Sequence, residues 1–209
     1  MAPPGTLILH DLTTARPRPA RGALVELWRW FGSTAMALGG WKIAGDWPDD
    51  PKSVVIAAPH TSNWAGIWMV MAAAKWRIRL RYMGKKSLTE GPFGGIVRWT
   101  GCIPIDRSKS NDVVAAMQAA FAAETGLILA VPPEGTRDAV QKWKSGFYHI
   151  AVGAGVPITF AVMDYAKKTV SLPATLWPSG DYLADLKIIQ GFYAGATAKF
   201  PENFVMTGQ

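Results

Sequence analysis

The chain has 209 residues, enough for one domain with a sizeable core, and 49% of them are hydrophobic. Its net charge is +7, but the basic residues are spread along the sequence. The positive charge favours anionic partners such as membrane lipids or phosphorylated substrates, and the spread of the basic residues argues against nucleic acid. A single cysteine, Cys102, excludes an internal disulfide framework. Together with His10, His60 and His149 it shows no zinc-site spacing, so we expect no metal and no bound cofactor.

The N-terminal part of the chain divides into two segments. Residues 1–22 are rich in proline and arginine, and we expect them to form a flexible basic segment without a signal peptide. Residues 23–44 are long enough to span a membrane, but Glu26, Arg29 and Lys42 interrupt them. Their apolar residues recur at helical spacing, which predicts a helix lying on the membrane surface. Packing of the same helix on its own domain is the alternative.

Short apolar runs and helical patterns then alternate along the rest of the chain. Strands are expected at 53–58, 77–82, 102–106, 127–131 and 157–164. Helices are expected at 63–75, 92–100, 111–125, 144–153 and 181–193. This alternation predicts an α/β fold, in which helices flank a largely parallel or mixed central sheet. We expect residues 23–209 to form a single domain.

Two of the buried strands are followed at once by polar residues. His60 follows the first, and the run Glu134-Gly135-Thr136-Arg137 follows the second. Reactive residues of α/β folds gather where strands end, so both segments are candidates for a functional site. A lone histidine is more often structural, however, and such a run can be an ordinary turn. Neither segment by itself indicates an activity.

Taken together and in order, the motifs resemble a known family. The lysophospholipid acyltransferases related to 1-acyl-glycerol-3-phosphate acyltransferase have His-x4-Asp after the first core strand, then a strand ending in Ile-Asp-Arg. Glu-Gly-Thr-Arg and an apolar motif containing proline follow. The corresponding residues here are His60, 101–107, 134–137 and 156–158. The likeness covers roughly residues 25–195 and is strongest to the short bacterial branch.

The resemblance implies an acyltransferase domain that works at the cytoplasmic face of the inner membrane as a peripheral protein. Such an enzyme moves a fatty acyl group from an acyl carrier protein or CoA thioester to the hydroxyl of a lysophospholipid or related glycerophosphate acceptor. It implies His60 as the general base. The implied substrate-binding residues are Lys85, Arg107, Glu134, Gly135, Thr136 and Arg137. Among these, the cationic groups would bind the phosphate of the acceptor.

One residue departs from the family pattern. Ala65 stands where the motif has aspartate, and a methyl group cannot orient an imidazole or stabilise its cation. Loss of such an acid costs roughly 10⁴-fold in turnover, so we expect this chain to be inactive or severely impaired. An engineered change is favoured over natural replacement, because the other motifs are intact. In a natural variant, Asp138 or Glu134 could replace the acid only if the fold brings one of them close to His60.

Two alternative functions stay open at this point. A non-catalytic relative would keep the phosphate site and bind anionic lipids without turning them over. An N-acyltransferase would keep the same base and act on an amine-bearing lipid or metabolite.

Overall fold

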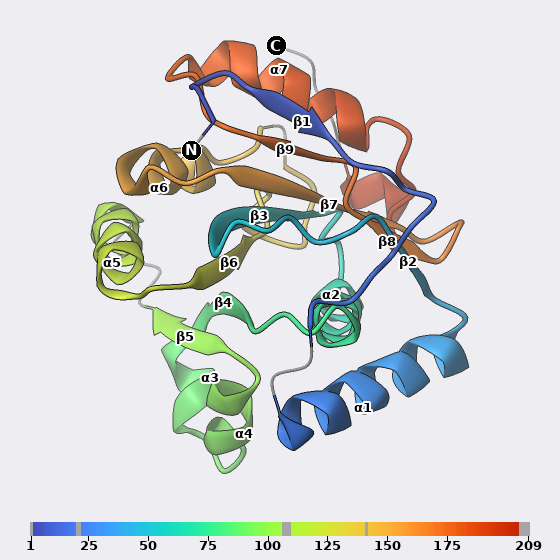
Figure 1. Cartoon of the computed structure of the whole chain (residues 1–209). Helices are drawn as coiled ribbons and strands as arrows, with labels where there is room; N and C mark the ends of the chain where they lie inside the picture. The colour runs from blue at the N-terminus through green and yellow to red at the C-terminus, as the bar shows by residue number, and fades with distance from the viewer. Residues whose placement is uncertain (1, 20–21, 106–109, 141, 205–209) are drawn as a thin grey trace.

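The computed structural model describes residues 2–19, 22–105, 110–140 and 142–204 (Figure 1). In these ranges nine strands form one sheet, with the main order β1-β9-β7-β3-β6-β4-β5, while β8 pairs with β7 and β2 with β8. The strands are β1 (Leu7–Leu9), β2 (Lys42–Ala44), β3 (Lys52–Ala58), β4 (Leu80–Lys85), β5 (Cys102–Ile105), β6 (Leu127–Val131), β7 (Ile158–Asp164), β8 (Thr169–Ser171) and β9 (Ala174–Leu176). A mixed central sheet was expected, and that expectation is confirmed.

Helices cover both faces of this sheet (Figure 1). They are α1 (Ala23–Gly39), α2 (Asn63–Lys75), α3 (Lys86–Glu90), α4 (Gly94–Trp99), α5 (Ser110–Ala123), α6 (Gly146–Ala154) and α7 (Tyr182–Tyr193), with a 3₁₀ turn, η1 (Pro201–Asn203). Strand β3 shows why two layers are needed. Val54 and Ile56 pack in the core beneath α5, α6 and α7, whereas Val55 and Ala57 pack in the core beneath α1 and α2. A strand buried on both faces is a continuous apolar run, as the sequence has it.

The direction of the central strands creates one shared edge. β3 runs parallel to both β6 and β7, and β4 runs parallel to both β6 and β5. The carboxyl ends of these five strands therefore lie at the same edge of the sheet. Because β3 and β6 are direct neighbours, the loops that follow them lie side by side.

The structure corrects both expectations about the N-terminal part. The helix expected at 23–44 ends at Gly39, because Gly40 takes a left-handed conformation (φ 73°) and Lys42–Ala44 forms β2. Residues 1–22, expected to be a flexible segment, contain β1, which pairs with β9 at the edge of the sheet. Among the described residues, no helix combines the length and the apolar content that crossing a membrane requires.

The strand expected at 77–82 also begins later, at Leu80. Arg77 interrupts it with a left-handed backbone (φ 61°). The guanidinium of Arg77 donates hydrogen bonds to the carboxylate of Glu26 and to the carbonyl of Arg18, so it joins this turn to α1 and to the N-terminal segment. Tertiary pairing, which a period-two pattern does not reveal, therefore sets the start of the strand.

Helices α1 and α2 approach each other through glycines. Gly32 of α1 is buried, and a Cβ there would lie 2.7 Å from Ala74 Cβ and 2.8 Å from the carbonyl oxygen of Met71. Gly39 is similarly covered by the indole of Trp68. A larger residue at either position would force the two helices apart.

Gly32→Leu should therefore lower the free energy of unfolding by about 1–3 kcal/mol through overpacking. Urea unfolding followed by tryptophan fluorescence measures this change. Gly191→Leu in α7 is the matched control, because a Cβ at Gly191 meets nothing within 4 Å. Equal losses in the two variants would contradict the close approach of α1 and α2.

Candidate active site

A hydrogen bond joins the two loops that the sequence singled out. The backbone N–H of His60, after β3, donates to Oε1 of Glu134, after β6, over 3.0 Å. These residues are 74 positions apart in the sequence. The parallel pairing of β3 with β6 brings them together at the shared edge of the sheet.

The environment of Glu134 is unusual for a carboxyl group. The residue is only 2% exposed, and among the described residues no group donates a hydrogen bond to its Oε2. Burial raises the pKa of Glu134 to about 7, against the lowering effect of backbone hydrogen bonds that include the one from His60. Both protonation states are therefore populated near neutral pH.

The first turn of α2 lies beside the imidazole of His60. The helix begins at Asn63 as expected, with Ser62 as the N-cap residue in extended conformation. A Cβ at Gly66 would lie 3.7 Å from Cε1 of His60, which places the ring next to this turn. Ala65 is fully buried in the same turn. Position 65 is thus next in sequence to Gly66, where the helix contacts the ring of His60.

Of the two acids considered as replacements for the motif aspartate, the fold brings only Glu134 into contact with His60. The bond joins the carboxyl group to the backbone of His60, so it positions the loop that carries the ring. Asp138 instead accepts a hydrogen bond from the hydroxyl of Thr136 over 3.1 Å at an exposed position. Within the described ranges, no three His, Cys, Asp or Glu side chains gather closely enough to hold a metal ion.

Arg137 connects the second loop to α2 and to a later segment. Its guanidinium donates to the side-chain oxygen of Asn63, and its carbonyl accepts from Nδ2 of Asn203 over 3.2 Å. The hydroxyl of Thr61 accepts from the backbone N–H of Phe200 over 3.1 Å. Residues 200–204, here called the brace, therefore contact both loops. Sequence reasoning missed the brace, because no motif in it indicates a link to either loop.

The remaining candidates lie at different distances from this centre. Gly135 has a left-handed backbone (φ 68°) inside the second loop, which explains a glycine there. Lys85 is exposed at the end of β4, the neighbour of β6, and so lies at the same edge of the sheet. Arg107 lies outside the described residues.

Lys144 is a further residue that sequence reasoning did not connect to the site. Its backbone N–H donates to the carbonyl of Pro133 over 2.8 Å, and its side chain crosses directly over Gly135. The only sequence signal for this contact is the glycine itself, since a residue with a Cβ would collide with the lysine.

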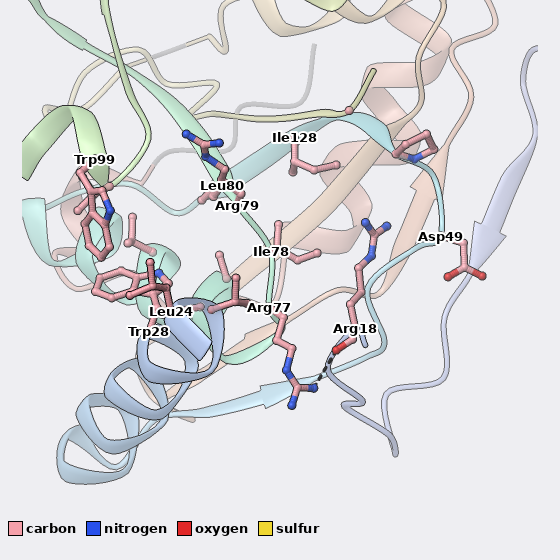
Figure 2. A pocket seen from close by; sticks show the side chains of 17 residues that line it. Arg18, Leu24, Trp28, Asp49, Arg77, Ile78, Arg79, Leu80, Trp99 and Ile128 are labelled. Carbon is pink, nitrogen blue, oxygen red and sulfur yellow. Dashed lines mark hydrogen bonds between the residues drawn. The ribbon is translucent and has the colours of Figure 1, made fainter. Parts of the chain in front are cut away.

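A cavity among the described residues lies away from this centre. It measures about 500 Å³ and is lined by residues at the amino ends of the central strands, including Leu80 and Ile128 (Figure 2). Trp28 and Trp99 close one side of it, while Arg77 lies on the other side and bonds to the carbonyl of Arg18. This cavity therefore lies at the edge of the sheet opposite to that of His60 and is separate from the candidate active site.

Comparisons with known proteins agree on one family. The model of the acyltransferase family matches residues 48–163, which include β3, β6 and both loops. The 1-acyl-sn-glycerol-3-phosphate acyltransferase of Haemophilus influenzae is 31% identical over 168 residues, 76% of this chain and 67% of that enzyme. The enzyme of the same name from Escherichia coli K12 is 33% identical over 152 residues, 68% of this chain and 60% of its own length. The chain thus spans three fifths to two thirds of these relatives.

A solved structure supports the fold. The crystal structure of the 1-acyl-sn-glycerophosphate (LPA) acyltransferase PlsC from Thermotoga maritima matches with a TM-score of 0.55 and 16% sequence identity. The match covers 81% of this chain and 76% of that protein.

The raised pKa of Glu134 predicts a pH-dependent stability. The folded protein holds this proton up to a pH of about 7, whereas an exposed glutamate loses it near 4.5, so the free energy of unfolding should fall as the pH rises between these values. Glu134→Gln keeps an acceptor for the backbone N–H of His60 and removes the titrating group. The shifted pKa of that group corresponds to a change on the order of 3 kcal/mol in the free energy of unfolding between the two pH values. Urea unfolding from pH 4 to pH 8 should show a smaller decrease in the variant than in the parent.

The exposed Glu202→Gln is the control for this titration and should follow the parent. A Glu134→Gln profile parallel to that of the parent would show that Glu134 is not a source of the pH dependence.

Proposed function

The chain belongs to the acyltransferase family, and on that premise we propose that it transfers a fatty acyl group from an acyl thioester to the hydroxyl of a lysophospholipid. The observation that carries the proposal is the hydrogen bond between His60 and Glu134, which fixes a histidine beside a loop that bears Arg137. We propose acyl carrier protein or CoA as the carrier of the donor, and lysophosphatidate or a related glycerophosphate as the acceptor. The thioester is a co-substrate, and the proposed reaction uses no further cofactor.

The proposed reaction needs one proton acceptor and one site for an anion. The imidazole of His60 takes the proton of the acceptor hydroxyl as the oxygen attacks the thioester carbonyl carbon. Collapse of the tetrahedral intermediate breaks the carbon–sulfur bond, and the leaving thiolate receives the proton from the imidazolium. The products are the acylated lipid and a free thiol, which carries the proton that the hydroxyl lost, so His60 is left neutral and the enzyme is unchanged.

The surrounding groups have distinct proposed roles. The guanidinium of Arg137, held by Asn63, offers charge-assisted hydrogen bonds to the phosphate of the acceptor, and Lys85 adds positive charge from the end of β4. Arg107 is proposed as a further cation on the sequence motif alone. Glu134 keeps the backbone of His60 in place. Gly135 and Thr136 shape the loop between these groups.

Ala65 is the reason to propose that this chain is impaired. Its methyl group packs in the core beneath α1 and α2 and offers no charge to an imidazolium. A carboxylate at the same buried position would be costly unless it paired with His60. An aspartate at position 65 would therefore either pair with the imidazole of His60 or lower the stability of the fold.

Ala65→Asp should raise acyl transfer to lysophosphatidate by roughly 10⁴-fold, because it supplies the acid that orients and stabilises the imidazolium. Transfer of a labelled acyl group from acyl carrier protein and from CoA measures the gain. Ala65→Asn has nearly the same size without the charge and should gain far less. His60→Ala in the Ala65→Asp chain should remove the gain.

Two other functions are tested by the same assay. Ala65 itself favours a non-catalytic protein that binds anionic lipids, and this reading predicts lysophosphatidate binding without turnover in the Ala65→Asp chain. An N-acyltransferase predicts a gain only with amine acceptors in the same panel. Absence of any gain with hydroxyl acceptors would overturn the proposed function.

We further propose that the protein binds the membrane surface peripherally, at the cytoplasmic face of the inner membrane. Large apolar side chains form an exposed stripe on α1, at the helical spacing of one face: Leu24, Leu27, Phe31 and Leu38. Trp99 of α4 contacts Trp28 of α1, with ring centroids 4.9 Å apart, so the exposed Ile96 and Phe93 extend the stripe. An exposed apolar surface on a protein with a net charge of +7 is suited to binding an anionic bilayer.

Leu24→Gln with Leu27→Gln should weaken binding to vesicles of phosphatidylcholine and phosphatidylglycerol by roughly 100-fold, since each buried leucine contributes about 1.5 kcal/mol. Co-sedimentation measures the bound fraction. Leu183→Gln is the control, because Leu183 is also exposed and its helix, α7, lies on the opposite side of the molecule from α1 (Figure 1). An equal loss in the control would exclude α1 as the membrane contact.

A further inference from the structure

The side chain of Lys144 lies against the loop that follows β6. A Cβ at Gly135 would lie 2.7 Å from Cδ of Lys144, 2.8 Å from Cε and 3.0 Å from Nζ. These three atoms form the distal end of the side chain, which therefore lies over the glycine with its ammonium group beside the backbone of the loop. A Cβ at position 135 would displace the lysine side chain from this place.

The backbone also holds Lys144 in place. Its N–H donates to the carbonyl of Pro133 over 2.8 Å, one residue before Glu134. The lysine therefore contacts the loop at two points, on either side of the glutamate that binds His60. Lys142 is exposed two residues earlier, and no such contact with the loop is found for it among the described residues.

The ammonium group of Lys144 has no carboxylate partner within ion-pair distance among the described residues. Two acids lie in the loop: Glu134 is buried and its pKa of about 7 leaves it partly protonated, and the exposed Asp138 accepts a hydrogen bond from the hydroxyl of Thr136. Arg137 also lies in the loop, with its guanidinium turned to Asn63. The exposed face of the loop thus combines two cations with the single carboxylate of Asp138, which forms an ion pair with neither of them among the described residues, and this arrangement is suited to a dianion.

We propose that Lys144 binds the phosphate monoester of the acceptor and holds it over Gly135, with Arg137 as the second cation. This inference rests on the proposed function and makes Lys144 a specificity residue for acceptors that carry phosphate. The glycine at position 135 then has two roles, since it permits the left-handed turn and leaves the space in which the lysine lies.

Lys144→Met removes the charge and keeps an unbranched stem. It should weaken binding of lysophosphatidate to the chain, measured by calorimetry below the micelle concentration, by about 10- to 100-fold, the worth of a hydrogen bond between charged groups. Binding of the corresponding monoacylglycerol should be unchanged. Lys144→Arg should retain most of the affinity, and Lys142→Met, the matched control, should retain all of it.

The experiment separates the two possible sources of the phosphate. CoA also carries a phosphate monoester, and its binding should not change in Lys144→Met. A loss of CoA binding with lysophosphatidate binding intact would overturn the assignment to the acceptor. Equal losses in Lys142→Met and Lys144→Met, or a parent chain that binds lysophosphatidate no better than monoacylglycerol, would overturn it too.

A second measurement distinguishes this inference from the proposed function. In the Ala65→Asp chain, Lys144→Met should raise the KM for lysophosphatidate and leave the KM for the acyl donor unchanged. If that chain shows no transfer while Lys144→Met still weakens lysophosphatidate binding, the proposed function fails and the phosphate site stands. If transfer occurs with an unchanged KM and unchanged binding, the Lys144 site fails and the proposed function stands.

Discussion

The parallel pairing of β3 with β6 is the constraint on which the site depends. It places the carboxyl ends of two central strands next to each other, so the backbone of His60 can donate to the carboxyl group of Glu134. The bond joins residues that are 74 positions apart, and Glu134 is buried where it accepts it. Each strand is buried by helices on both faces, so neither loop can shift without disturbing both cores. The packing of the central strands therefore keeps the two loops of the site in fixed positions.

Elements with strong local patterns could be predicted from the sequence. α2 and β6 have the predicted bounds, and β3 differs by one residue at its start. Such elements are predictable because a buried strand or helix is an apolar run between turn residues. The short strands β1, β2, β8 and β9 were missed, since three residues carry no readable period and their pairing comes from distant parts of the chain. The start of β4 was misplaced for the same reason, as the ion pair of Arg77 with Glu26 fixes it.

The candidate site was predictable to a similar degree. Motif order singled out His60 and the loop of Glu134, and strand adjacency explains why these meet. The contacts of Lys144 and of the brace could not be read in the same way, because each depends on how the backbone turns after a strand has ended. Ala65 was visible in the sequence, but its full burial, which makes an acid there costly without a partner, was not.

The brace has a consequence for the order in which the protein is made. Residues 200–204 hold both loops through Thr61 and Arg137, yet they are synthesised after every strand of the described sheet. During translation the sheet and its edge can form first, while the two loops lack their common support. A nascent chain therefore presents an unfinished binding surface, and the site becomes complete only when this late segment has left the ribosome and folded back.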